Sequence, residues 1–224
     1  MPRSRRIIFP GYPHHVTHRG NGGRPIFLDK EDHLRYLMLL DEYTTKFRCA
    51  VLGYCLMTNH VHLMLKPEGN TNLGSCMHGL AFLYAQWFNR THSLTGHLWE
   101  SCYYSCPVDT DEHLWRVMRY VYRNPVSAGI VTIPWEYRWS SAKSTCFGEL
   151  NPYINLDNWL DPVNIAAYRE YLIWSDDPGA IRTATRRGTP LGVFTNLEGA
   201  VPKTPLLGQP QKGQFRDCPQ NVAV

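Results

Sequence analysis

The sequence predicts an α+β domain built on a four-stranded antiparallel sheet with two helices on one face. The expected elements over residues 12–108 follow the order strand, helix, strand, strand, helix, strand, which is the split βαβ or ferredoxin-like plan. Only Thr58 and Asn59 separate the two middle strands, so these strands are antiparallel neighbours. A chain of 224 residues, 43% hydrophobic and 12% aromatic, can bury the core of one main domain.

The first strand and the first helix are expected within residues 12–47. Alternating polar and apolar residues through Val16 indicate a strand over 12–20. The glycine-rich stretch 20–23 is a loop flexible enough for its backbone to approach a phosphate closely. A helix over 31–47 is predicted by apolar residues at helical spacing, namely Leu34, Leu37, Met38 and Tyr43.

The remaining sheet elements are predicted between residues 49 and 108. Short runs rich in Val and Leu predict strands over 49–57 and 60–65, and weaker alternation predicts one over 99–108. A helix over 72–89 begins at Asn72 as N-cap and is expected to bury Leu73, Met77, Leu80, Leu83, Tyr84 and Trp87. With both helices on one face, the opposite sheet face is open to a ligand.

The strand over 60–65 begins with two histidines that flank Val61. Because strand side chains alternate in direction, His60 and His62 share one face and Val61 points to the other. Two imidazoles on one face form a metal-chelating geometry. Two solvated or core-bonded histidines at a strand edge would give the same pattern, so the pair alone leaves both interpretations open.

A further helix is predicted over residues 109–124, with Asp109 or Asp111 as N-cap and Pro125 limiting its extent. Its buried line is expected to be Leu114, Val117, Met118 and Val121. Tyr120 and Asn124 are four residues apart and project from one helix face, whereas Tyr122 points roughly 200° away from Tyr120. The phenol and the amide could reach a site on the sheet, or form a packing contact and a C-terminal cap.

Both ends of the chain are basic although the net charge is only +4. Residues 161–174 predict another amphipathic helix, 176–192 a basic turn-rich segment, and 201–224 a proline-containing disordered tail. Basic ends suit phosphate contacts, and scattered solubilising charge is the alternative. The candidate DNA contacts are Arg3, Arg5, Arg6, Arg19, Arg24, Arg186 and Arg187.

Composition also indicates where the protein works. The seven cysteines are odd in number and contain no CxxC motif, which favours reduced thiols over a disulfide framework. No apolar run approaches the roughly 20 residues of a membrane span, and the N-terminus lacks the apolar core of a signal peptide. We therefore expect a cytoplasmic protein that associates with the nucleoid and not with a membrane.

Several ordered motifs resemble one known family. They are HHVT at 14–17 with RGN at 19–21, LMTNHVHL at 56–63, GHLWE at 96–100, RYVYRNPVSAG at 119–129, WSS at 139–141 and RTATRRGTPLG at 182–192. In this order they resemble the single-tyrosine HUH transposases, the IS200-like family, and within it the REP-associated tyrosine transposases of bacteria. An ordered match of this kind is more specific than either the histidine pair or the tyrosine alone.

The resemblance implies a site and a reaction. His60 and His62 would bind Mg²⁺ or Mn²⁺, Asn124 would stand in the place of a polar third ligand, and Tyr120 would be the nucleophile. The partner would be single-stranded DNA carrying hairpins of repetitive palindromes, cut with a 5′-phosphotyrosine intermediate and a free 3′-OH. A phenol with a pKa near 10 is a good leaving group, so such a link conserves energy for rejoining. Residues 1–150 would be the catalytic domain and 151–200 a DNA-contacting extension, with 201–224 as the tail.

The chain departs from the family pattern at four positions. Tyr122 stands where histidine is common and Thr58 where proline is frequent, while Cys102 and Ser127 replace common arginines. Two DNA contacts could therefore be missing, which keeps a catalytically weak DNA-binding module as an alternative. A hydrolytic phosphoesterase is a third interpretation, because His15 and Thr17 lie beside the second histidine strand. The sequence leaves monomer and homodimer both open.

Overall fold

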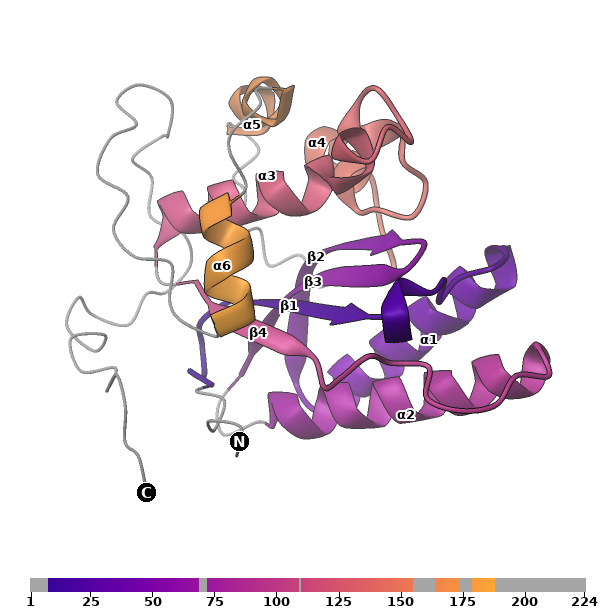
Figure 1. Cartoon of the computed structure of the whole chain (residues 1–224). Coiled ribbons are helices and arrows are strands. Elements are labelled where there is room, and N and C mark those ends of the chain that lie inside the picture. The colour runs from indigo at the N-terminus through magenta and orange to yellow at the C-terminus, as the bar shows by residue number, and fades with distance from the viewer. Residues whose placement is uncertain (1–7, 69–71, 109, 155–163, 174–178, 188–224) are drawn as a thin grey trace.

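The computed structural model describes residues 8–68, 72–108, 110–154, 164–173 and 179–187. Within these ranges it contains an α+β domain with a four-stranded sheet (Figure 1). None of the helices in the described part combines the length and apolar character needed to cross a membrane. The predicted tail over 201–224 and the residues Arg3, Arg5 and Arg6 lie outside the described residues.

The elements between residues 14 and 127 follow the predicted order. They are β1 His14–Arg19, η1 Asn21–Gly23, α1 Lys30–Lys46, β2 Cys49–Met57, β3 His60–Pro67, α2 Leu73–Thr91, β4 Tyr104–Pro107 and α3 Asp111–Ser127. After them come η2 Pro134–Glu136, α4 Ala142–Phe147, α5 Ile165–Ile173 and α6 Gly179–Arg187. The sheet order is β2-β3-β1-β4 with every neighbouring pair antiparallel, which confirms the ferredoxin-like plan.

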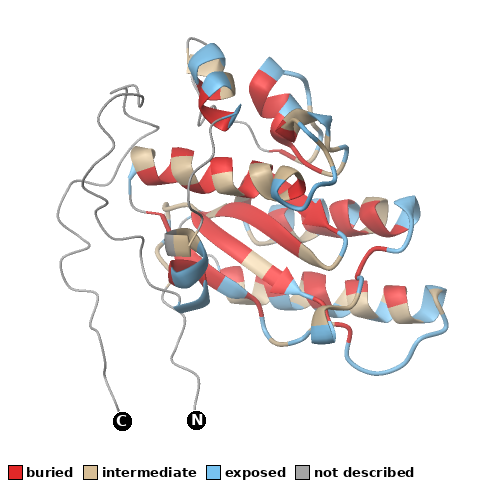
Figure 2. Ribbon diagram, turned by 45° about the horizontal axis from the view of Figure 1, so that its top comes forward, coloured by how far each residue is buried: buried red, intermediate tan, exposed pale blue. Residues whose placement is uncertain are grey.

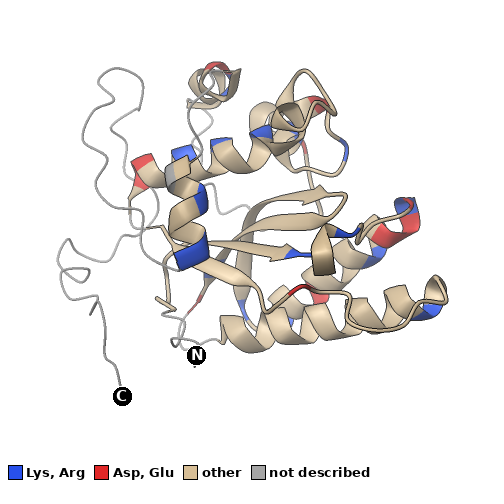
Figure 3. Ribbon diagram, viewed as in Figure 1, with Lys and Arg blue, Asp and Glu red and all other residues tan. Residues whose placement is uncertain are grey.

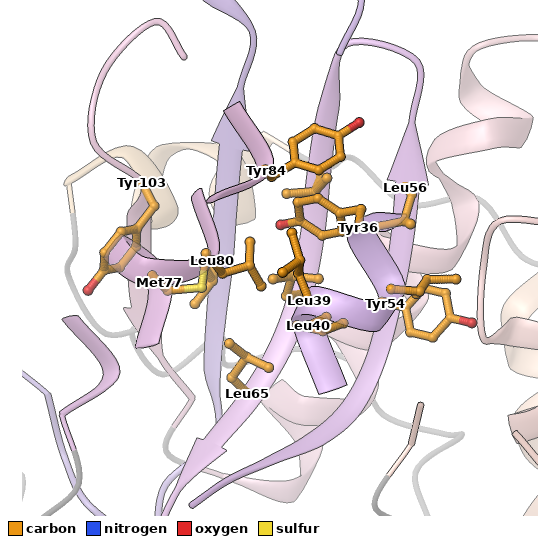
Figure 4. Close-up of a cluster of buried hydrophobic side chains, with 14 of the residues drawn as sticks. Tyr36, Leu39, Leu40, Tyr54, Leu56, Leu65, Met77, Leu80, Tyr84 and Tyr103 are labelled. Carbon is orange, nitrogen blue, oxygen red and sulfur yellow. The ribbon is translucent and has the colours of Figure 1, made fainter. Parts of the chain in front are cut away.

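Helices α1 and α2 cover one face of the sheet, as predicted. Alternation along β1 and β3 directs Val16, Leu63 and Leu65 to this face, where all three are fully buried. Leu40 of α1 and Leu80 of α2 fill the space between the layers (Figure 4). Asn72 caps α2 by accepting from the Ser75 N–H, which confirms the predicted N-cap.

The opposite face of the sheet is not open, and this part of the prediction was wrong. Met64 of β3 and Cys106 of β4 pack in a second core cluster with the predicted apolar line of α3, to which α5 adds Tyr168 and Leu172. Helix α6 contacts β4 and β1 on the same side. Figure 2 shows the buried residues of both layers, with the sheet between them. The face that carries the histidine pair is therefore enclosed by helices.

Helix α3 differs from its prediction at both ends. Its N-cap is Thr110, whose hydroxyl accepts from the His113 N–H, and Asp111 lies in the first turn instead. The helix continues through Pro125 to Ser127. A proline removes one N–H from the helix ladder, and the Asn124 side chain compensates by lying 3.3 Å from the carbonyl of Val121.

Two further predictions were wrong in detail. The fourth strand is confined to Tyr104–Pro107 because the carbonyl of Ser101 accepts a hydrogen bond from His18 and leaves the ladder. The segment predicted as basic and turn-rich contains α6, a regular helix from Gly179 to Arg187. Ala184 is buried in the second core cluster, so tertiary packing stabilises this helix.

Candidate active site between the sheet and helix α3

The two histidines of β3 lie on the sheet face that α3 covers. Strand β1 places Thr17 opposite His62 and Arg19 opposite His60, so these four side chains share that face. The rings of His60 and His62 are 4.8 Å apart and nearly perpendicular at 82°. His62 is buried, while His60 is only partly buried near the end of the strand. The predicted common face is present.

Helix α3 brings Tyr120 to the same place. Its ring stands edge-on to His62, with ring centroids 5.3 Å apart, and edge-on to His15 at 5.7 Å. Tyr122 points elsewhere: it is fully buried, and its hydroxyl lies 3.0 Å from Ser141 Oγ and 2.8 Å from Thr145 Oγ1. Of the two neighbouring phenols, only Tyr120 is placed beside the histidines.

The amide of Asn124 is oriented by the backbone of its own helix. Its Nδ2 donates to the Tyr120 carbonyl at 2.7 Å, one turn earlier. Only the nitrogen end of an amide can donate to a carbonyl, so this bond identifies the two ends of the side chain. The acceptor, Oδ1, is the potential oxygen ligand, and the Asn124 amide also interacts with the side chains of His62 and Tyr120.

Hydrogen bonds at the Nδ1 atoms also orient the histidine rings. His60 Nδ1 is 2.7 Å from Asn59 Oδ1, and the Asn59 amide nitrogen donates to the Gly23 carbonyl. His60 therefore carries its proton on Nδ1 and presents Nε2 as an acceptor. His62 Nδ1 lies 3.0 Å from His15 Nε2, and His62 Nε2 is buried without a hydrogen-bond partner among the described residues. A buried nitrogen without a partner suits a metal ligand.

Burial and nearby cations keep these imidazoles neutral. Burial, with Arg19 and Arg182 nearby, lowers the pKa of His60 to about 4. The pKa of His62 is lowered well below its ordinary value by burial and by the neighbouring His60 and His15. Neutral imidazole is the form that binds metal. His60, His62 and the Asn124 oxygen are thus donors of the kinds that could hold a divalent ion here.

Two arginines of α6 influence the pKa of Tyr120. Burial raises the pKa of Tyr120, and a hydrogen bond and the positive charge of Arg182 oppose that rise, as does the charge of Arg186. Figure 3 shows basic residues in blue on the ribbon of α6, beside the sheet and α3. Arg186 was among the predicted contacts, whereas Arg182 was missed because only the fold brings it to Tyr120.

The other predicted arginines that the structure describes differ in their relation to this site. Arg19 is exposed at the end of β1 and contributes to the lowered pKa of His60. Arg24 donates to the His97 carbonyl and so ties two loops together. Arg187 is the last residue of α6, is exposed, and is not among the groups that shift the pKa of Tyr120. Of the predicted arginines that the structure describes, Arg19 and Arg186 are thus linked to the site.

One other cluster has the composition of a metal site. Among the described residues, Asp29, Asp32 and His92 form the close group of three His, Cys, Asp or Glu side chains that could hold a metal ion. Asp29 and Asp32 form the capping box of α1, and Asp32 Oδ1 is 2.8 Å from His92 Nε2. The carboxylate oxygens of Asp29 and Asp32 already accept hydrogen bonds from backbone N–H groups at the start of α1. This cluster stabilises a helix terminus and lies apart from Tyr120.

Comparison with known proteins identifies the family. The family model described as transposase, IS200 like, matches residues 12–124, just over half of the chain. No curated protein matches this chain. A solved REP-associated tyrosine transposase bound to a REP hairpin has a TM-score of 0.57 and 17% identity, over 72% of this chain and 94% of that chain. A putative transposase from Deinococcus radiodurans gives a TM-score of 0.39 and 16% identity, over 54% and 95% of the two chains. The chain belongs to the IS200-like transposase family.

Proposed function

We propose that this transposase nicks and rejoins single-stranded DNA beside hairpin-forming palindromes, with Tyr120 as nucleophile and with His60, His62 and Asn124 as ligands of Mg²⁺ or Mn²⁺. The observation that carries the proposal is the position of Tyr120, edge-on to His62 at 5.3 Å. Tyr120 of α3 then faces the two histidine ligands of β3, and Asn124 lies one helical turn from the nucleophile on α3 itself.

Each half of the reaction exchanges one phosphodiester for another. In the first, Tyr120 Oη attacks phosphorus, the bond from phosphorus to the 3′ oxygen breaks, and the phenol loses its proton while the departing oxygen gains one. In the second, a 3′-OH attacks the phosphotyrosine and releases the phenol. A bound Mg²⁺ or Mn²⁺ would polarise the phosphodiester and stabilise the departing 3′ oxygen. Because no water is consumed, the sequence of steps is transesterification.

The side chains around Tyr120 have distinct roles in this scheme. Arg182 favours the phenolate that attacks, because its positive charge and hydrogen bond oppose the rise in the pKa of Tyr120. Arg19 and Arg186 border the site and would hold the phosphates of the strand. The extension over 151–200 would act with the domain over 1–150 as one unit, since it supplies α6.

The hydrolytic alternative has less support from the geometry. It requires His15 to serve as a general acid or base. Nδ1 of His15 is 2.8 Å from Thr185 Oγ1, and Nε2 is 3.0 Å from His62 Nδ1. Both ring nitrogens are thus occupied within a buried network, and His15 is only 1% exposed.

A covalent-adduct gel tests the proposal. Labelled single-stranded DNA with a palindromic hairpin is incubated with Mn²⁺ or Mg²⁺ and run under denaturing conditions. We expect an adduct with the wild type and with Tyr122→Phe, and none with Tyr120→Phe or His62→Ala. A thermal melt of each variant confirms folding. Tight hairpin binding by the wild type without any adduct would instead support the DNA-binding module.

A further inference from the structure

A buried chain of hydrogen bonds connects α6 to the metal-facing histidine. Thr185 Oγ1 donates to the Ile181 carbonyl at 2.8 Å within α6. The same oxygen is 2.8 Å from His15 Nδ1, and His15 Nε2 is 3.0 Å from His62 Nδ1. The rings of His15 and His62 are stacked, with centroids 5.2 Å apart and planes 9° apart. Thr185, His15 and His62 are 4%, 1% and 3% exposed, so solvent does not compete for these bonds.

The donors and acceptors in this chain can be assigned in one direction. A hydroxyl has a single proton, and that of Thr185 is used at the Ile181 carbonyl. Thr185 Oγ1 must then accept from His15 Nδ1–H. A buried imidazole without an acidic partner is neutral, so His15 Nε2 has a lone pair and accepts from His62 Nδ1–H. The remaining nitrogen, His62 Nε2, is left unprotonated.

We propose that Thr185 and His15 are positioning residues that hold His62 in the Nδ1–H tautomer, so that its Nε2 is free to bind the divalent ion. This inference rests on the proposed function, because it assumes that His62 is a ligand. Helix α6 would thereby set metal affinity from a segment about 120 residues away in the sequence. An outer hydrogen bond of this kind fixes the tautomer and orientation of a ligating ring.

His60 provides an internal comparison. Its Nδ1 bonds to Asn59, the adjacent residue in the chain, and not to α6. A change in Thr185 should therefore alter the tautomer of His62 and leave that of His60 unchanged. A general disturbance of the site would alter both.

The test uses the full-length chain with Thr185→Val, Thr185→Ser and, as a matched control, Thr183→Val, whose site is exposed on the same helix. Valine cannot accept from His15 Nδ1–H, so we expect the His15 proton to move to Nε2. The His62 proton must then move to its own Nε2. Long-range ¹H–¹⁵N spectra of the metal-free protein read both tautomers, and calorimetry with Mn²⁺ reads the affinity. We expect Thr185→Val to bind Mn²⁺ about 10- to 100-fold more weakly.

The outcomes separate this inference from the proposed function. Wild-type affinity and an unchanged His62 spectrum in Thr185→Val would overturn it, as would a wild-type His62 protonated at Nε2. Equal losses in Thr185→Val and Thr183→Val would also overturn it. Recovery by Thr185→Ser, with melting temperatures close to that of the wild type, is the expected result. If the tautomers behave as proposed and no DNA adduct forms, the relay of hydrogen bonds from Thr185 through His15 to His62 is supported and the proposed nicking function is refuted.

Discussion

Replacement of Arg182 by glutamine tests whether α6 activates the nucleophile. The guanidinium hydrogen-bonds Tyr120 and opposes the effect of burial on its pKa. A hydrogen bond to a charged group contributes about 1.5–3 kcal/mol, which corresponds to a rate loss of about 10- to 150-fold. Arg182 is exposed, so solvent screens its charge and the lower limit applies. We therefore expect adduct formation to slow by about tenfold near neutral pH.

The pH dependence of this loss distinguishes activation from simple DNA contact. The phenolate attacks, so the wild-type rate rises with pH as Tyr120 loses its proton. Without Arg182 the pKa of Tyr120 is higher and the same rise occurs at higher pH. The defect is therefore constant while Tyr120 is protonated in both proteins and shrinks once the pH exceeds the wild-type pKa.

The assay measures the initial rate of adduct formation at saturating DNA from pH 7 to about pH 11, because burial raises the pKa of Tyr120 above the value near 10 of free tyrosine. Arg187→Gln, an exposed arginine on the same helix, serves as the control. A defect of equal size at every pH would refute the activation argument and assign Arg182 to phosphate binding. Equal losses in the two variants would do the same.

Two further predictions concern stability. Burial lowers the pKa of His14 to about 4 and that of His15 to about 3, so between these values and 6.5 the unfolded chain binds more protons than the folded one. The free energy of unfolding should then fall as the pH is lowered from 7 to 5, by up to about 1.4 kcal/mol per pH unit for each histidine. Urea titrations at several pH values measure this free energy, and a value independent of pH would contradict the prediction. Gly53→Ala should destabilise by about 1–3 kcal/mol, because a Cβ there would lie 2.3 Å from Met118 Cε and 2.6 Å from Tyr122 Oη. An unchanged urea midpoint would contradict this, because it would mean that the α3 side chains move aside without loss of stability.

Local periodicity was sufficient to predict the hairpin and the helices that carry most of the core. Strand β2 has the predicted bounds, and β3 begins at the predicted His60. The apolar spacing along α3 indicated Leu114 and Val117 as buried, and they are. The errors occurred where distant residues decide the structure. Helix α6 reads as a basic segment because its buried side is small, and Ala184 is buried only because β4, β1 and α3 lie beneath it.

The candidate site shows the same division between local and distant information. Tyr120 and Asn124 share a helix face by spacing alone, and His60 and His62 share a strand face in the same way. No local pattern connects Arg182 or Thr185 to those residues, because each contact joins separate elements. Identifying them required the placement of α6 over β1 and β4.

The adjacent histidines of β1 show why a site of this kind depends on strand register. His15 points toward His62, whereas His14 points to the opposite face, where its Nδ1 bonds to the Tyr12 carbonyl. The pairing of Thr17 with His62 fixes this assignment. A slip of one residue would exchange the faces and put His14 beside His62 in place of His15. Register is a property of the folded sheet, so the relay from Thr185 through His15 to His62 exists only once β1, β3 and α6 have come together.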